Sequence, residues 1–292
     1  MYVYFAAASS LVLPGPLWFV TASIAALFAI FYPVVLAIIL SKRLNIDPHY
    51  AGYGALIFFL FQIVTRIPLV QVLGGALAPT LKSSSTALLL WLIALSLTAG
   101  LFEEVGRYVG YRWLMRKEQK TWEKALMYGA GHGGIESILL VGLSLGFSVL
   151  IGLVLLVVPT NVLPASLQEQ LGAQYASIAA QPGWLPLLGM WERLWTLPVH
   201  LALSVIVVQM FLRGQRRWLW LAIGAHAMVD FVSVALPPLL GIKGLTSAFL
   251  SEGFVALFGL LALLVIRWLS SAQPPTPDAP IRVGYEIVPN SK

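Results

Sequence analysis

The stretch SSSTALLLWLIALSLTAGLFEEVGRYVGYRWLM, residues 83–115, decides the fold class. Its first half is an apolar run that approaches the length of a bilayer-spanning helix, about 20 residues. Its second half places Glu103, Glu104 and Arg107 in the same run, before the basic residues that begin at Arg112. Charged side chains within a span are costly, and they usually pair with one another or mark a functional site. The stretch therefore predicts a membrane helix with a buried polar face.

The composition of the whole chain agrees with a membrane protein. Of its 292 residues, 59% are hydrophobic and 10% are charged, whereas soluble domains carry about 25% charged residues. The chain has no cysteine, which excludes disulfides, thiolate metal sites and a cysteine nucleophile. The pI near 9.6 is attributed to basic loops that face anionic lipid, so the bilayer is the expected partner and nucleic acid is not.

Seven segments are long and apolar enough to cross a membrane. They are roughly 17–40, 51–73, 86–113, 124–158, 187–212, 217–240 and 249–269. We therefore expect an all-α, polytopic transmembrane helical bundle. Basic residues gather at alternate ends of these spans, which predicts an N-terminus outside and a C-terminus in the cytoplasm. An eighth span is the alternative, and it would break this charge pattern.

The remaining segments are short or polar. We expect one transmembrane domain over residues 1–269 and a disordered cytoplasmic tail over 270–292, which is rich in proline and polar residues. Residues 2–13 are too few to cross alone and are expected at the interface or as an extension of the first helix. The loop segment 163–180 is expected to form a surface helix on the outer face.

Ionisable residues within the predicted spans form a compact set. They are Arg66, Glu103, Glu104, Arg107, His132, Glu136, Glu192, Arg193, His200, His226 and Asp230. At about 1.5 Å of rise per residue, the acids and histidines of four helices lie roughly 12–20 Å from the basic helix ends. Because polar groups at similar depth are unfavourable when scattered in lipid, we expect one inward-facing cluster around a wet cavity that opens toward the cytoplasm.

Spacing along the helices places these residues on shared faces. Glu103 and Arg107 are four apart, as are His132 and Glu136, and residues 226 and 230. A buried carboxylate can act as a general base on water, and a neighbouring histidine can hold the same water or protonate a leaving amine. A second histidine beside an aspartate can stabilise an oxyanion. The set therefore indicates hydrolysis.

The same residues permit other interpretations. His132, His200 and His226 with one carboxylate form a plausible zinc shell. The chain has no HExxH motif, so the sequence favours a metal-free, glutamic-type mechanism without a cofactor, and zinc is the alternative.

Purely structural roles stay open for the whole set. The glutamates and the arginine of residues 83–115 can lock two helices together as an ion pair, and the histidines can form helix–helix hydrogen bonds. For Arg66, Glu192 and Arg193, structural ion pairs are the favoured interpretation, with Glu192 and Arg193 near the outer surface.

Three short motifs resemble a known group of membrane proteins. The motifs EExxxR, FxxxH and Hxxx(N/D/B) of the CAAX-prenyl endopeptidase and bacteriocin-processing (CPBP, or Abi) superfamily resemble three segments of this chain. The first resembles Glu103-Glu104 followed by Arg107, and the second resembles Tyr128-x-x-x-His132. The third resembles the histidine at 226 with the acid at 230. The segments FEEVGRYVGYRWL, GAGHGGIESILL and HAMVDF more closely resemble the YhfC family of predicted glutamic-type intramembrane proteases. The first motif here is EExxR, and Tyr128 stands in place of phenylalanine.

The resemblance implies an intramembrane endopeptidase of a bacterial cell membrane that acts on a membrane-associated peptide or protein substrate. It implies catalytic roles for either glutamate with His132 as the groups that activate water, and for His226 and Asp230 on the oxyanion side. Supporting roles fall to Arg107, Tyr128, Glu136 and His200. A non-catalytic scaffold or immunity-type factor that binds a membrane peptide is the alternative from another class, because a related branch of the superfamily resembles a scaffold subunit.

Overall fold

The computed structural model describes residues 11–158 and 162–271, and within these ranges every regular element is helical. Seven helical runs there are long and apolar enough to cross a membrane. They are Pro16–Leu44, His49–Ser83, Ser85–Leu114, Trp122–Val157, Pro186–Arg213, Arg217–Ala235 and Gly244–Ser271. The predicted all-α bundle with seven spans is therefore confirmed. The segment 1–10 and the predicted tail from residue 272 lie outside the described residues.

Several spans change from α-helix to π-helix along their length. The elements are α1 (Pro16–Leu44), α2 (His49–Phe58), η1 (Phe59–Arg66), α3 (Ile67–Ser83), α4 (Ser85–Val109), η2 (Gly110–Leu114), α5 (Trp122–Glu136), η3 (Ser137–Leu143), α6 (Ser144–Val157), α7 (Ala165–Ala179), α8 (Pro186–Arg213), α9 (Arg217–Asp230), η5 (Phe231–Ala235), α10 (Leu236–Leu239) and α11 (Gly244–Ser271), in which η denotes π-helix. π-Helical turns are rare in proteins, and those that occur are often found at functional sites.

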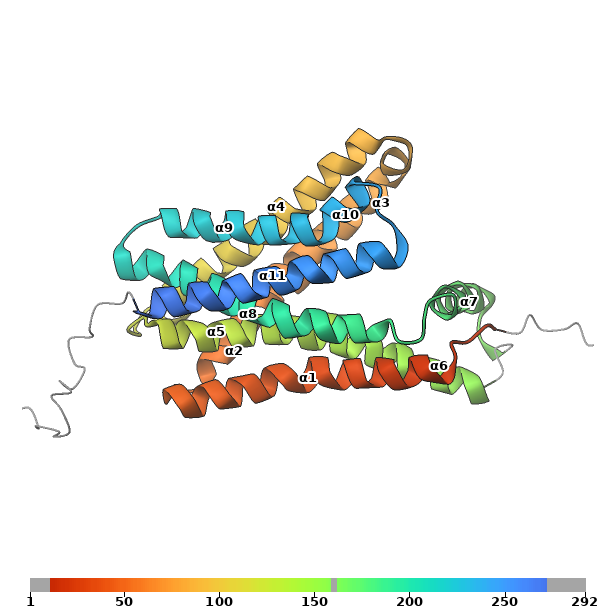
Figure 1. Ribbon diagram of the computed structural model, residues 1–292, viewed down its shortest axis with the longest axis horizontal. Helices are drawn as coiled ribbons and strands as arrows, with labels where there is room; N and C mark the ends of the chain where they lie inside the picture. The colour runs from red at the N-terminus through yellow and green to blue at the C-terminus, as the bar shows by residue number, and fades with distance from the viewer. Residues whose placement is uncertain (1–10, 159–161, 272–292) are drawn as a thin grey trace, which may run out of the picture.

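The spans run alternately between two ends of the bundle. One end, here called the basic end, carries Lys42, Arg43, Arg112, Arg116, Lys117, Lys120, Lys124, Arg213, Arg216, Arg217 and Arg267. The other is called the distal end, and the predicted surface helix lies there as α7 (Figure 1). The direction in which the two ends face across the membrane stays a prediction.

Helix α8 lies at the centre of the bundle (Figure 1). In its apolar window 72% of the residues are buried, against 17–39% for the other spans. It packs extensively against α5 and α11, while α2 packs against α5 and α4 against α9. The ionisable residues of α4, α5 and α9 are therefore arranged around one buried helix.

Glycines set the closest approaches between these helices. A Cβ on Gly131 would lie 1.8 Å from the Ala51 carbonyl oxygen, and one on Gly133 would lie 2.8 Å from Cβ of His200. On α4, a Cβ on Gly100 would lie 2.6 Å from a carbonyl oxygen of α9. Since small residues let helix backbones approach closely in membranes, the glycines beside His132 draw α5 toward both α2 and α8.

Candidate active site

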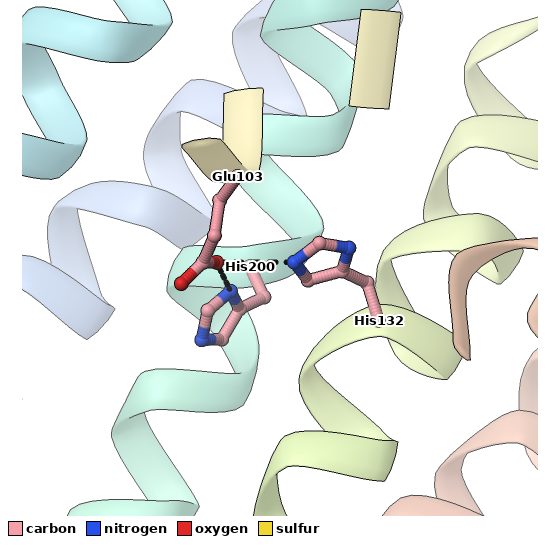
Figure 2. Close-up of side chains that lie close together, drawn as sticks. All are labelled: Glu103, His132 and His200. Atoms are coloured by element: carbon pink, nitrogen blue, oxygen red, sulfur yellow. Dashed lines mark hydrogen bonds and ion pairs between the residues drawn. The ribbon is translucent and has the colours of Figure 1, made fainter. Parts of the chain in front are cut away.

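The Glu103 carboxylate lies at the centre of the predicted cluster of ionisable residues. Its Oε2 accepts a hydrogen bond from His132 Nε2 at 3.0 Å and lies 3.8 Å from Nδ1 of His200. Its Oε1 lies 3.9 Å from Nε2 of His226. Figure 2 shows Glu103, His132 and His200 pointing toward one another from three different helices. The structure thus brings three of the predicted histidines around one carboxylate.

Sequence reasoning missed one direct partner of this carboxylate. The Gln62 amide donates to Glu103 Oε1 at 2.7 Å, and its side chain is buried. Gln62 lies in η1, one turn before Arg66. A glutamine one turn from the charged residue of this span was the available signal, because an amide in lipid needs a partner.

Glu104 faces a different set of groups. It pairs with Arg107 in a contact that leaves both side chains fully buried, and it accepts from Nδ1 of His226 at 2.7 Å. Arg107 also lies 3.6 Å from Glu103 Oε2 and donates to Nδ1 of His200 at 2.8 Å. The two adjacent glutamates therefore have separate environments, with Glu103 among the histidines and Glu104 against the arginine.

A second chain of charges approaches His200 from the other side. Glu136 Oε2 lies 2.9 Å from Nε2 of His200, and its Oε1 accepts from Arg193 at 2.8 Å. Arg193 also pairs with Glu192, as the sequence predicted. His200 consequently has a carboxylate on Nε2 and presents Nδ1 to Arg107 and Glu103.

One cavity of about 220 Å³ is lined by most of this set. The ionisable residues in its wall are Arg66, Glu103, Glu136, Glu192, Arg193, His200, His226 and Asp230. At about 30 Å³ per molecule, such a volume accommodates several waters. Glu104 and Arg107 are not in the wall, so of the two glutamates only Glu103 faces the cavity.

Three further predicted site residues lie around this set. Within the described residues Arg66 forms no ion pair, and instead donates to the Leu95 carbonyl at 2.6 Å, to Thr98 and to Gln62. The reason is that Glu104 turns toward Arg107, while Glu192 turns toward Arg193. Asp230 lies at the cavity edge, 3.9 Å from His226 Nε2, and is 35% exposed. Tyr128 lies behind the site, tilted against Tyr111 with ring centroids 4.7 Å apart and stacked on His132 with ring centroids 6.5 Å apart.

The described residues contain one group of side chains whose donor atoms could share a metal ion. Glu103, His132 and His200 each offer a ligand atom, and these atoms lie within 4.8 Å of one another. The set expected from sequence was His132, His200 and His226 with one carboxylate. Glu103 supplies the carboxylate, whereas His226 lies outside the group, with Nδ1 bonded to Glu104 and Nε2 3.9 Å from the other Glu103 oxygen.

The donor chemistry of this group fits a metal. Two imidazoles and one carboxylate are a ligand set found in catalytic zinc sites. Glu136 on the far nitrogen of His200 supplies the carboxylate that often orients a histidine ligand. Two contacts oppose the fit, since His132 Nε2 is bonded to Glu103 and Arg107 donates to Nδ1 of His200.

Comparison with known proteins gives the family. The sequence model described as "YhfC intramembrane metalloprotease" matches residues 28–255, which include every residue of the site. The chain belongs to this family. The YhfC assignment makes the chain an integral membrane protein of a family described as intramembrane proteases. That description names a metal, whereas the sequence favoured a metal-free glutamic mechanism.

A curated relative supports the same YhfC family. The chain is 29% identical over 184 residues to the uncharacterized membrane protein YhfC of Bacillus subtilis (strain 168). The alignment covers 61% of this chain and 66% of the relative, which is just under two thirds of its length. No solved structure matches the chain.

Proposed function

We propose that this YhfC-family chain is an intramembrane endopeptidase that hydrolyses peptide bonds of a membrane-associated substrate, and that Glu103, His132 and His200 hold a zinc ion. The carrying observation is that Glu103 lies in the wall of one cavity and meets three histidines, of which His200 and His226 also line the cavity while His132 lies behind it. A buried carboxylate with imidazoles on both of its oxygens is suited to moving protons to and from water. The scaffold interpretation needs no such arrangement.

The chain's own residues divide the work of hydrolysis. Without a metal, Glu103 takes a proton from the water whose oxygen attacks the peptide carbonyl carbon, and the proton then passes to the amine as the C–N bond breaks. As a zinc ligand, Glu103 would instead help to hold the ion. His132 Nε2 holds the carboxylate in place. Bound zinc would supply the Lewis acidity that activates water and polarises the carbonyl.

Two further groups assist the reacting carbonyl. Nε2 of His226 faces the cavity while Nδ1 is fixed by Glu104. In its doubly protonated form His226 donates from Nε2 to the developing oxyanion, and Asp230 at 3.9 Å supports that form. The likeness of these pairs to the CPBP superfamily belongs to the same proposal.

A metal-free glutamic mechanism is the second candidate. It is favoured by two direct contacts, His132 to Glu103 at 3.0 Å and Arg107 to His200 at 2.8 Å, because both already use donor atoms that a metal would need. In this form the same Glu103 and His132 prime the water without an ion.

The test uses purified protein in liposomes with quenched-fluorescence transmembrane peptides rich in leucine and alanine. We expect cleavage that phenanthroline abolishes and zinc restores, and about one zinc per chain that His132→Ala removes. Cleavage that persists in zinc-free, chelator-treated protein would contradict the zinc mechanism and support the glutamic mechanism. No cleavage of any peptide by folded, zinc-loaded protein would contradict endopeptidase activity.

A further inference from the structure

A second hollow of the bundle lies outside the candidate active site, among residues of α1, α2 and α5. Its volume is about 440 Å³, and it shares no lining residue with the cavity around Glu103. Helices α1 and α2 both pack against α5. On α5, His132 is bonded to Glu103, whereas Gly131 and Gly134 line the hollow. The two cavities are therefore separate, although one helix contributes to both.

The hollow is a groove with a buried floor and exposed rims. Gly134 of α5 is buried in the floor, where a Cβ would lie 3.0 Å from Cβ of Pro33. On the rim formed by α1, Val34 and Ile38 are 44% and 49% exposed. On the rim formed by α2, a Cβ on Gly52 would meet nothing within 4 Å. The groove therefore opens to the outside of the bundle, which is lipid in a membrane.

The groove runs from the basic end toward the middle of the bundle. On α1 its wall extends from Lys42, near that end, to Pro33, which corresponds to about 14 Å along the helix. This length is about half of the roughly 30 Å hydrocarbon core, so the groove matches one leaflet. A spanning helix of another protein would need a groove that crosses both leaflets.

One charged side chain stands at the mouth of the groove. Of the described residues that line it, Lys42 alone is charged, and Arg43 follows it on the same helix end. Asp47, the nearest acid in sequence, pairs with His49 at 2.7 Å. Basic pockets between spans at a membrane surface bind anionic lipid head groups. The charge at the mouth and the apolar wall behind it therefore fit the two parts of one phospholipid.

We propose that this groove binds one anionic phospholipid, with an acyl chain along the floor formed by α5 and its phosphate at Lys42. The acyl chain fills the space beside the glycines and supplies the van der Waals contacts that a void would lack. The lipid then contacts α1, α2 and α5 on the side of α5 away from Glu103. The proposal does not depend on proteolysis.

The test uses purified protein in phosphatidylcholine liposomes that contain a trace of a lipid with a photoreactive diazirine on its acyl chain. The probe has either a phosphatidylglycerol or a phosphatidylcholine head group, and mass spectrometry of peptides locates the adducts. We expect adducts to concentrate on groove residues such as Val34 and Ile38. The phosphatidylglycerol probe should give about fivefold more of them, the effect of one basic residue near an anionic group.

Two substitutions test the wall and the mouth. Gly52→Leu fills the groove from α2 and should lower the groove adducts at least about fivefold, because the lipid would have to share space with the new side chain. Gly75→Leu on α3 is its matched control, since a Cβ there also meets nothing within 4 Å and Gly75 lies outside the groove. Lys42→Gln should abolish the preference for phosphatidylglycerol, whereas Lys117→Gln, exposed at the same end but outside the groove, should keep it.

Adducts spread evenly over the exposed faces of the spans would overturn the proposal, as would equal groove adducts in the two leucine variants. Equal groove adducts from the two probes would overturn the assigned head group. Groove adducts that disappear as the protein density in the liposomes rises would assign the groove to a second copy of the chain instead of a lipid. If thermal unfolding shows that Gly52→Leu does not fold, the comparison of the two probes on the wild type and Lys42→Gln decides.

Discussion

Glu136 Oε2 lies 2.9 Å from Nε2 of His200, on the side of the ring away from Glu103 and Arg107. The contact fixes which nitrogen of His200 carries the proton, and it leaves Nδ1 directed at the site. Carboxylates in this position typically raise the basicity of a histidine ligand and hold its ring in place.

Glu136→Ala should therefore weaken zinc binding about 10–100-fold, the usual effect of removing such a partner. Arg193 keeps Glu192 as an ion-pair partner, so the change leaves no lone buried charge. Competition with a fluorescent zinc chelator measures the affinity. Glu192→Ala, which removes a contact to the same arginine, is the control and should bind zinc normally; equal affinity in both variants would disprove the orienting role.

Substitution of each of the two adjacent glutamates should have a different effect on the stability of the protein. Glu104→Gln removes the charge that Arg107 pairs with in a fully buried contact, and breaking such pairs costs about 3–5 kcal/mol. Glu103, 3.6 Å from Arg107, offsets part of this cost. Thermal unfolding in detergent should show a larger loss for Glu104→Gln than for Glu103→Gln. The reverse order would mean that Glu103 is the structural partner.

Close packing of α2 on α5 should be sensitive to a single methyl group. A Cβ on Gly54 would lie 2.0 Å from the Tyr128 carbonyl oxygen, whereas one on Gly52 meets nothing within 4 Å. Gly54→Ala should destabilise the protein by about 1–3 kcal/mol and displace α5, which carries His132. Gly52→Ala on the same helix should be neutral or slightly stabilising. Similar melting temperatures for the two variants would contradict the observed helix contact.

A pH-dependent contact involves Glu118, which lies in the turn between η2 and α5, outside the spans. The Tyr50 hydroxyl donates to Glu118 at 2.6 Å and Lys124 lies 3.1 Å away, and these bonds lower the pKa of Glu118 below 4.5. Because the folded-state pKa is the lower one, this stabilisation is present above the unfolded-state value and is lost as the pH falls through the folded-state value.

The wild-type protein should therefore have a higher melting temperature than Tyr50→Phe at neutral pH. The difference between the two melting temperatures should shrink in acid as Glu118 becomes protonated. Thermal scans of both proteins across this range measure it. A difference that is independent of pH would mean that the Tyr50 hydroxyl stabilises the fold without depending on the charge of Glu118.

Much of the fold and part of the site could be predicted from sequence because both follow from the membrane. Apolar runs must be helices in lipid, and the ends of the seven spans differ from the observed ones by a few residues for most helices. Four helices carry histidines and acids at similar depth. Unless these side chains converge, each would lie in lipid without water or a polar partner. Their convergence on Glu103 follows the same cost argument.

The remaining features depend on three-dimensional packing that spacing does not encode. The two glutamates are adjacent in sequence, which did not indicate that Arg107 would pair with Glu104 and that Glu103 would contact the histidines. The π-helical turn η1 directs Gln62 at Glu103 and leaves Arg66 without the expected acid. Which residues line the cavity also depended on packing, because Tyr111 and Tyr128 are fully buried and lie outside its wall.

The most direct test of the central claim is the rate at which purified Glu103→Gln protein cleaves a transmembrane peptide that the wild type cleaves, in the same liposomes. The account predicts a loss of about 10²–10⁴-fold, with the protein still folded as judged by thermal unfolding. A rate within the error of the wild type would contradict the assignment of Glu103 as the reacting carboxylate.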